Sequence, residues 1–142
     1  MYHERVWPPL SWFLISLLII PAVILALAPI NLGLGIVSAV LMYVAIVAFL
    51  LVMSPRISVD DGTFRAGRGQ IERDFLGEAR AISGAERFDA LHSGLDARAW
   101  LCLRSWTNGL VRVDLTDPAD PTPYWLVSTR SPDALVKALN SR

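Results

Sequence analysis

The chain has 142 residues with 13 basic and 13 acidic side chains, so its formal net charge is zero. Nucleic-acid-binding domains usually carry a basic excess on one face, and this balance argues against that class. The single cysteine, Cys102, excludes an internal disulfide bond and is typical of a protein in a reducing cytoplasm.

Residues 6–55 contain no Asp, Glu, Lys, Arg or His. A membrane-spanning helix needs about 20 apolar residues, because it rises ~1.5 Å per residue across a hydrocarbon core ~30 Å thick. We therefore predict a transmembrane helical hairpin in residues 1–55, with spans at about 10–28 and 34–53. Residues 29–33 combine a Pro, an Asn and a Gly, which predict the turn, and Pro21 is expected to bend the first span.

A cleavable signal peptide is the competing interpretation of the first apolar half, because Ala26–Ala28 resembles a cleavage site. Two retained spans are favoured, since the apolar stretch exceeds the usual length of about 7–15 residues and a second apolar stretch follows directly.

The cations lie on either side of the apolar stretch. Arg5 precedes it, Arg56, Arg65 and Arg68 follow it, and the turn between the spans has none. Positive flanks stay in the cytoplasm, so we predict a multi-pass protein of the cell membrane with both termini cytoplasmic. Binding of anionic lipid by charge alone is not expected, because acidic residues alternate with these arginines along the sequence.

The two spans offer little for transport but one candidate for helix packing. Spans without ionisable side chains have no evident path for ions or protons. Gly35 and Ala39 have the small-xxx-small spacing that lets helices approach closely, so they are a candidate helix–helix contact.

Residues 56–142 are expected to form one small α+β domain. Alternation of apolar and polar residues predicts strands at 57–60 and 63–66, joined by a turn at Asp61–Gly62. Further strands are expected at 70–75 and 77–82. A helix with Ser83 as its N-cap then follows.

The rest of the domain is expected to add more strands and a terminal helix. Residues 100–106 are predicted to form a strand, and Asn108–Gly109 predicts a hairpin turn into a strand at 111–115. A rigid loop with three prolines at 117–123 precedes a strand at 124–129. Ser131–Pro132 opens a C-terminal helix. Antiparallel strands closed by a helix are typical of a pleckstrin-homology-like (PH-like) barrel, the fold that we expect, and the same pattern also fits other small α+β folds.

Three segments together carry a family pattern: the opening Tyr2–Pro8, the segment Leu95–Trp100 leading to Arg104–Trp106, and the long motif Asp117–Arg130. They resemble the pattern of DUF3093, an uncharacterised family of actinobacterial membrane proteins. The resemblance covers nearly the whole chain. It implies a two-span anchor with a small cytoplasmic domain, and it implies no activity, substrate or catalytic residue.

Few residues are candidates for catalysis or metal binding. His92 lies three residues after Asp89 and four before Asp96, so the three are candidates for one helix face, but the spacing matches no recognised metal site. Cys102 lies between two leucines, and a buried structural thiol is favoured over a nucleophile. Turn chemistry is favoured over cation binding for the two aspartates of the 117–123 loop. We expect no cofactor and no metal.

A group of aromatic and charged residues near the long motif forms a candidate docking surface, because Trp, Tyr and Arg are enriched at binding hot spots. Its members are Trp106, Asp117, Asp120, Tyr124, Trp125 and Arg130. The alternative, which we favour, is that the aromatics fill the core and Arg130 pairs with one of the two aspartates.

The sequence leads to one main functional hypothesis and two alternatives. The main hypothesis is a non-enzymatic adaptor, anchored in the bilayer, whose PH-like domain binds protein or lipid at the cytoplasmic face. The first alternative is an accessory subunit of a larger membrane complex, held through Gly35 and Ala39. A membrane-bound enzyme is the less favoured alternative, because it needs a pocket with perturbed titratable groups.

Overall fold

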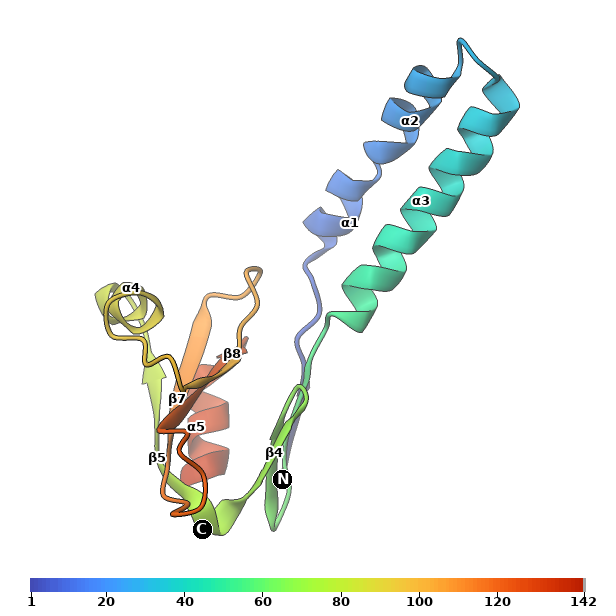
Figure 1. Ribbon diagram of the computed structural model, residues 1–142. Helices are drawn as coiled ribbons and strands as arrows, with labels where there is room; N and C mark the ends of the chain where they lie inside the picture. The colour runs from blue at the N-terminus through green and yellow to red at the C-terminus, as the bar shows by residue number, and fades with distance from the viewer. Residues whose placement is uncertain (142) are drawn as a thin grey trace. The chain divides into compact units, whose positions relative to one another are not determined.

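The computed structural model describes residues 1–141, and the chain divides into two compact units. The helix unit comprises Trp7–Ser54. The sheet unit comprises Met1–Val6 together with the described chain from Pro55 onward. Figure 1 shows the helices of the first unit and the strands of the second.

The helix unit is built from α1 (Leu10–Ser16), α2 (Ile19–Leu27) and α3 (Leu32–Val52), and the two predicted apolar segments are both helical. The first segment breaks between α1 and α2, one turn before Pro21. Pro21 has no N–H to give to the Leu17 carbonyl, which instead accepts a bond from the Ile20 N–H at 3.1 Å. The helix is thus interrupted for two residues just before Pro21, the residue at which we expected a bend.

Helix α2 packs along α3 within the helix unit. The side chain of Asn31 caps α3 by accepting a hydrogen bond from the Leu34 N–H at 3.0 Å. Gly35 and Ala39 are both buried in this contact. A Cβ at Gly35 would lie 3.4 Å from Leu27 Cβ, so this position admits the close approach of α2.

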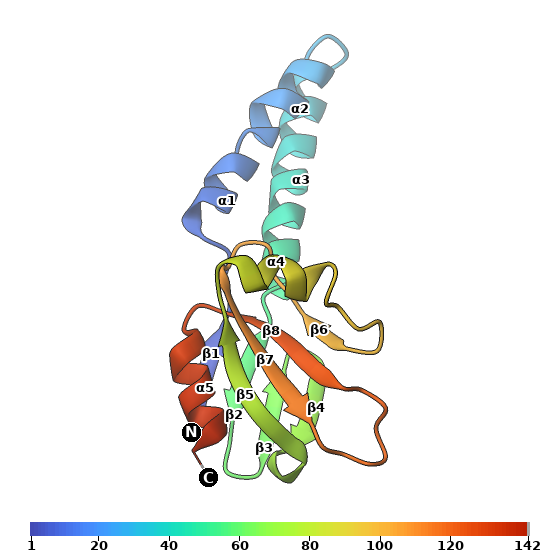
Figure 2. The ribbon, with the colours of Figure 1, turned by 90° about the vertical axis from the view of Figure 1, so that its left-hand side faces the viewer.

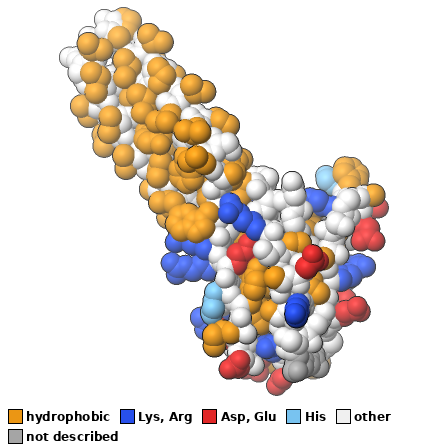
Figure 3. Space-filling view, turned by 180° about the vertical axis from the view of Figure 1, so that it is seen from behind, with side chains coloured by type: hydrophobic (Ala, Val, Ile, Leu, Met, Phe, Trp, Pro, Cys, Tyr) orange, Lys and Arg blue, Asp and Glu red, His pale blue; other side chains and the backbone are white. Residues whose placement is uncertain are grey.

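On the face shown in Figure 3, the helix pair carries many hydrophobic side chains and no acidic or basic ones along its length. By length and composition, both Leu10–Leu27 and Leu32–Val52 are long and apolar enough to cross a membrane. Only 0% and 17% of the residues in their apolar windows are buried.

The first sheet is fully antiparallel, with the order β1-β2-β3-β4. Its strands are β1 (Tyr2–Arg5), β2 (Arg56–Val59), β3 (Thr63–Ala66) and β4 (Gly69–Glu72). The strands predicted at 57–60 and 63–66 are confirmed. The strand predicted at 70–75 ends at Glu72, where the chain enters a 3-10 turn, η1 (Arg73–Phe75). Strand β1 was not predicted.

The second sheet has the order β5-β7-β8-β6. Its strands are β5 (Leu76–Ile82), β7 (Gly109–Leu115), β8 (Tyr124–Thr129) and β6 (Trp100–Cys102). The hairpin predicted at Asn108–Gly109 is wrong, because β7 already has β5 on one edge and β8 on the other. The strand predicted at 100–106 ends at Cys102 as β6. It pairs with β8 in parallel, the one exception to the antiparallel pattern among the described strands.

Two helices complete the sheet unit (Figure 2). Helix α4 (Ala85–Leu91) follows β5, but Gly84 occupies its N-cap with φ 57°, so the predicted Ser83 cap is wrong. Helix α5 (Pro132–Asn140) begins after Ser131 as predicted and packs on β5 and β7. Its C-terminal carbonyls at Ala138, Leu139 and Ser141 accept hydrogen bonds from the Arg73 guanidinium. The positive charge of Arg73 is favourable there, because the C-terminal end of a helix carries a partial negative charge.

The second sheet is covered on both faces, so every residue of β8 is buried. On one face, Trp125 and Val127 join a core built from both sheets and α5. On the other face, Tyr124 and Leu126 pack under α4 and the segment after it. Where β4 meets β6, a Cβ at Gly69 would lie 2.7 Å from the Trp125 ring and 2.8 Å from Trp100 Nε1. Only glycine allows this contact between the two sheets.

Candidate functional site

The residues of the candidate docking surface do not come together as an exposed surface. Tyr124 and Trp125 are 4% and 5% exposed and point to opposite faces of β8. The Tyr124 hydroxyl donates to the Gly94 carbonyl at 3.2 Å and accepts from the Asp96 N–H at 2.8 Å. The Trp125 ring packs 5.6 Å from Phe64. Both aromatics therefore hold the core, which is the alternative that the sequence favoured.

The other members of that group have mostly local roles. Trp106 is partly buried and donates from Nε1 to the Val6 carbonyl at 3.3 Å. Asp117 and Asp120 accept bonds from the N–H groups two residues later, at 2.8 and 2.9 Å, as turn-forming aspartates do. The Thr122 bonds hold the pKa of Asp120 below its ordinary value. The Arg130 N–H donates to the Glu4 carboxylate at 2.8 Å, a partner that the sequence did not suggest.

Among the residues that the structure describes, no group of three or more His, Cys, Asp or Glu side chains is placed to hold a metal ion. Helix α4 ends at Leu91, so Asp96 does not share a helix with His92. The His92 ring stacks on Phe88 with centroids 4.2 Å apart. Asp96 is bound by Arg98 at 3.0 Å, which lowers its pKa to about 2. Cys102 is buried as predicted, and burial raises the pKa of its thiol.

A different set of residues gathers on the outer face of the first sheet. Side chains alternate between the two faces of a strand. Ile57 and Val59 of β2 point into the core, so Arg56 and Ser58 point outward. By the same alternation Arg65 of β3 points outward, and it is exposed.

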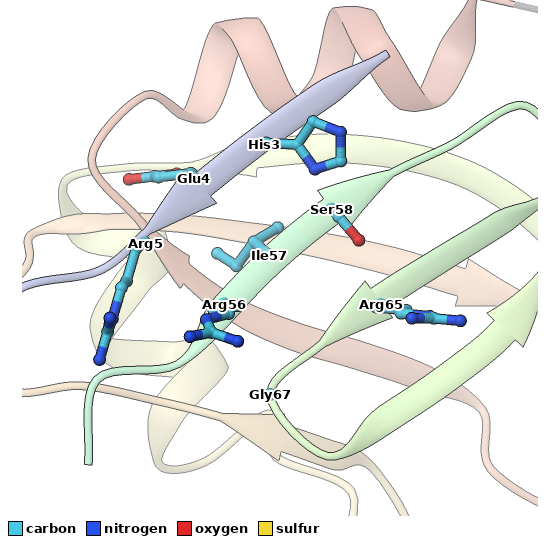
Figure 4. Close-up of a pocket in the computed structure, with 8 residues that line it drawn as sticks. All are labelled: His3, Glu4, Arg5, Arg56, Ile57, Ser58, Arg65 and Gly67. Carbon is cyan, nitrogen blue, oxygen red and sulfur yellow. The ribbon is translucent and has the colours of Figure 1, made fainter. Parts of the chain in front are cut away.

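The strand register brings these outward residues into neighbouring rows. Arg5 of β1 lies directly opposite Arg56 of β2. In the next row, Ser58 lies between His3 and Arg65. Together the three strands line a hollow of about 430 Å³ (Figure 4). We call the four arginines at this side of the sheet the arginine end: Arg5, Arg56, Arg65 and Arg68.

Arg68 joins the group through the turn between β3 and β4. The Gly67 N–H donates to the Arg56 carbonyl at 3.0 Å, so this turn lies at the Arg56 end of β2. Gly67 has φ 63°, a conformation that glycine adopts without strain. The adjacent Arg68 is exposed.

The acidic residues that alternate with these arginines in sequence lie at the opposite end of the same sheet. Asp60 and Asp61 follow β2 into the turn at its far end, and Glu72 pairs with Thr63 near that turn. Asp60 lies 3.4 Å from His3. Four residues of strand separate Arg56 from Asp60, which is ~13 Å at 3.3 Å per residue. Arg56 is therefore well separated from Asp60 along β2, whereas the row of Ser58 and Arg65 lies only two residues, or ~7 Å, from it.

Glu4 is the acidic residue closest in sequence to the arginine end, and its carboxylate is used elsewhere. It accepts hydrogen bonds from the Tyr2 hydroxyl at 2.7 Å and from the Thr129 hydroxyl. In Figure 4 its side chain points away from Arg56 and Arg65. Burial and the bond to Glu4 raise the pKa of Tyr2 to about 12, so the phenol stays protonated and remains a donor.

Sequence reasoning missed the arginine end because the grouping depends on strand register. One signal was present: Arg5 and Arg56 are the charged residues that border the apolar stretch on its two sides. Fifty positions separate these two residues in the sequence, and the pairing of β1 with β2 makes them direct neighbours in the sheet.

No curated protein and no solved structure matches this chain. One family model does match, and it spans residues 1–139. Its description is "Protein of unknown function (DUF3093)". The chain therefore belongs to the DUF3093 family.

Proposed function

We propose that this protein is a membrane-anchored, non-enzymatic adaptor whose sheet unit is a PH-like domain at the cytoplasmic face of the cell membrane. One observation carries the proposal: two adjacent apolar helices expose their large hydrophobic side chains all round. In water this exposure is unfavourable by about 25 cal/mol per Å² of apolar surface, and in a bilayer the unfavourable term vanishes. A patch of this extent marks a membrane or protein contact.

The orientation follows from charge. The flanking residues Arg5 and Arg56 are at the open end of the hairpin, and the turn at 28–31 carries no charge. Positive flanks remain in the cytoplasm, so both chain ends and the sheet unit lie on that side.

The PH-like assignment is supported by the layout of the sheet unit. Two four-stranded sheets share one core, and the C-terminal helix α5 packs against that core. The C-terminal helix after β8 agrees with the PH-like layout, whereas the parallel pairing of β6 with β8 departs from its antiparallel strands.

A non-enzymatic role is supported by the use of the candidate catalytic residues in structure. Cys102 is buried with a raised pKa, which disfavours the thiolate. His92 stacks on Phe88, and Asp96 is bound by Arg98.

The alternative, an accessory subunit of a larger complex, loses the contact first suggested for it. Gly35 faces α2 of the same hairpin, and both Gly35 and Ala39 are buried. A subunit contact would have to use the outward faces of the helices instead.

Extraction of membranes at alkaline pH tests the anchor. The full chain is expected to stay in the membrane pellet after carbonate treatment at about pH 11, because its apolar helices are not held by charge. Release into the supernatant would contradict the proposal. Native mass measurement in gentle detergent then separates an adaptor, seen as a small particle, from a subunit, seen in a large complex.

A further inference from the structure

We propose that the arginine end binds the phosphate of an anionic phospholipid head group. The inference deepens the proposed function and rests on its membrane anchor. It names the ligand of the sheet unit: a lipid phosphate carrying net negative charge, held on the outer face of β1, β2 and β3.

The first argument is the pairing of two arginines inside the sheet. Arg5 and Arg56 are direct cross-strand partners in an antiparallel ladder. Two guanidinium groups are thereby placed on one face of the sheet, as the binding of a phosphate by arginine forks requires.

The second argument is the shape and chemistry of the hollow beside this pair. Arg65 of β3 and Ser58 of β2, which lie opposite each other, both line this hollow (Figure 4). Arginine presents a planar fork of donors that matches two phosphate oxygens at once, and a serine hydroxyl adds a further donor. The hollow of about 430 Å³ is large enough for a head group.

The third argument selects a lipid over a free phosphate. Arg5 lies five residues before Leu10, where α1 begins, and Arg56 lies four residues after Val52, where α3 ends. An extended chain reaches at most ~3.6 Å per residue, so these arginines stay within ~18 Å and ~14 Å of the helix ends. If the helices span a bilayer, the chain keeps both arginines within this reach of the hydrocarbon boundary.

The fourth argument is the distance of Arg5 and Arg56 from the acidic end of the sheet. Asp60 lies ~13 Å along β2 from Arg56, beyond the Debye length of about 8 Å at physiological ionic strength, whereas it lies ~7 Å from the row of Ser58 and Arg65. Arg5 and Arg56 therefore attract an anion with the least opposition from the acidic residues.

The test uses the full chain in an uncharged detergent, titrated with short-chain phosphatidylglycerol or phosphatidylcholine and read by native mass spectrometry. We expect phosphatidylglycerol to bind more tightly. Each juxtamembrane arginine contributes about a fivefold gain in anionic-lipid binding. The double variant Arg56→Gln/Arg65→Gln is therefore expected to lose roughly 25-fold, and Arg80→Gln, an exposed arginine of β5, should change nothing.

Further arms separate the possible failures. Arg56→Lys/Arg65→Lys keeps the charges and should retain most of the preference for phosphatidylglycerol.

Equal binding of both lipids to the unchanged chain would overturn this inference and leave the membrane anchor standing. Equal binding of inorganic phosphate and phosphatidylglycerol would replace the lipid with a free anion. A chain that stays soluble without detergent would contradict the proposed function itself. Loss of the preference in Arg80→Gln would show that overall charge, and no built site, attracts the lipid.

Discussion

The helix unit and the sheet unit differ in how far their apolar side chains are exposed. In the helix unit, Leu10 and Leu25 are 72% and 74% exposed. In the sheet unit, Leu110, Leu126 and Leu135 are fully buried. The sheet unit carries a buried core that stabilises it in water, whereas the helix unit leaves most of its apolar surface exposed. The two units are thus expected to respond differently to packing changes, charge changes and pH.

The largest expected effect is a loss of stability in the sheet unit that leaves the helix unit folded. At Gly109, a Cβ would lie 2.2 Å from the Thr129 carbonyl oxygen across the β7–β8 ladder. Gly109→Ala is therefore expected to destabilise the sheet unit by ~3 kcal/mol, the upper range for an overpacked site. Near-ultraviolet circular dichroism during heating should show the loss, while the helical signal at 222 nm largely persists.

Gly62→Ala is the matched control. A Cβ at Gly62 meets nothing within 4 Å, and its φ is not positive. We expect a change within ~0.5 kcal/mol. Equal destabilisation by both substitutions would contradict the close approach of β7 and β8.

A second prediction concerns the end of α5. Arg73→Gln removes the charged donor to two carbonyls of α5 and to the Ser141 carbonyl that follows it, with Nη2 lying 3.0 Å from the Ala138 oxygen. Hydrogen bonds from charged groups contribute ~2 kcal/mol, so the sheet unit should lose about that much. Urea unfolding of the full chain measures it. The exposed Arg80→Gln should differ from wild type by no more than ~0.5 kcal/mol.

A third prediction tests packing inside the helix unit. Gly35→Leu places a side chain where Leu27 Cβ and the Ile24 carbonyl oxygen already lie 3.4 and 3.5 Å from a Cβ. We expect a loss of ~1–2 kcal/mol in the α2–α3 contact, seen as earlier melting of the 222 nm signal in detergent.

The control is Val37→Leu, because Val37 is 57% exposed on the same helix. It should melt like the unchanged chain. If Gly35→Leu also melts like the unchanged chain, Gly35 is not needed for the α2–α3 contact.

The smallest effect is a titration at the N-terminus. The pKa of Tyr2 is raised to about 12 by burial and by its bond to Glu4, against an ordinary value of 10.0. A raised pKa favours the protonated form in the folded state. The stabilisation is therefore complete below about pH 10 and is lost as the pH rises through about 12.

Tyrosinate absorbance at 295 nm measures this step, and Tyr2→Phe should remove the component near pH 12. If all tyrosine absorbance in the folded chain appeared near pH 10, the packing of β1 against the sheet unit would be contradicted.

Local patterns in the sequence predicted local structure well. Apolar alternation located β2 and β3, and Ser131–Pro132 marked the start of α5. The apolar stretch predicted the helix pair and the effect of Pro21 on the first helix. In each case, the residues that decide the structure are near neighbours in the chain.

Long-range pairing could not be predicted in the same way. Strand β1 has only four residues and finds its partner β2 more than fifty positions later. Strand β6 pairs with β8, although Asn108–Gly109 favours a local hairpin. Arg73 caps a helix that ends 65 or more positions away. The arginine end, which depends on the register of three strands, escaped sequence analysis for this reason.

The central claim is that the helix unit spans the membrane with the sheet unit in the cytoplasm. Single cysteines at Ile30→Cys in the turn and Asp61→Cys in the sheet unit, both in a Cys102→Ser background, test it most directly. In intact cells, an impermeant maleimide should label Ile30→Cys at once and Asp61→Cys only after permeabilisation. Labelling of Asp61→Cys in intact cells, or of neither position before permeabilisation, would contradict the claim.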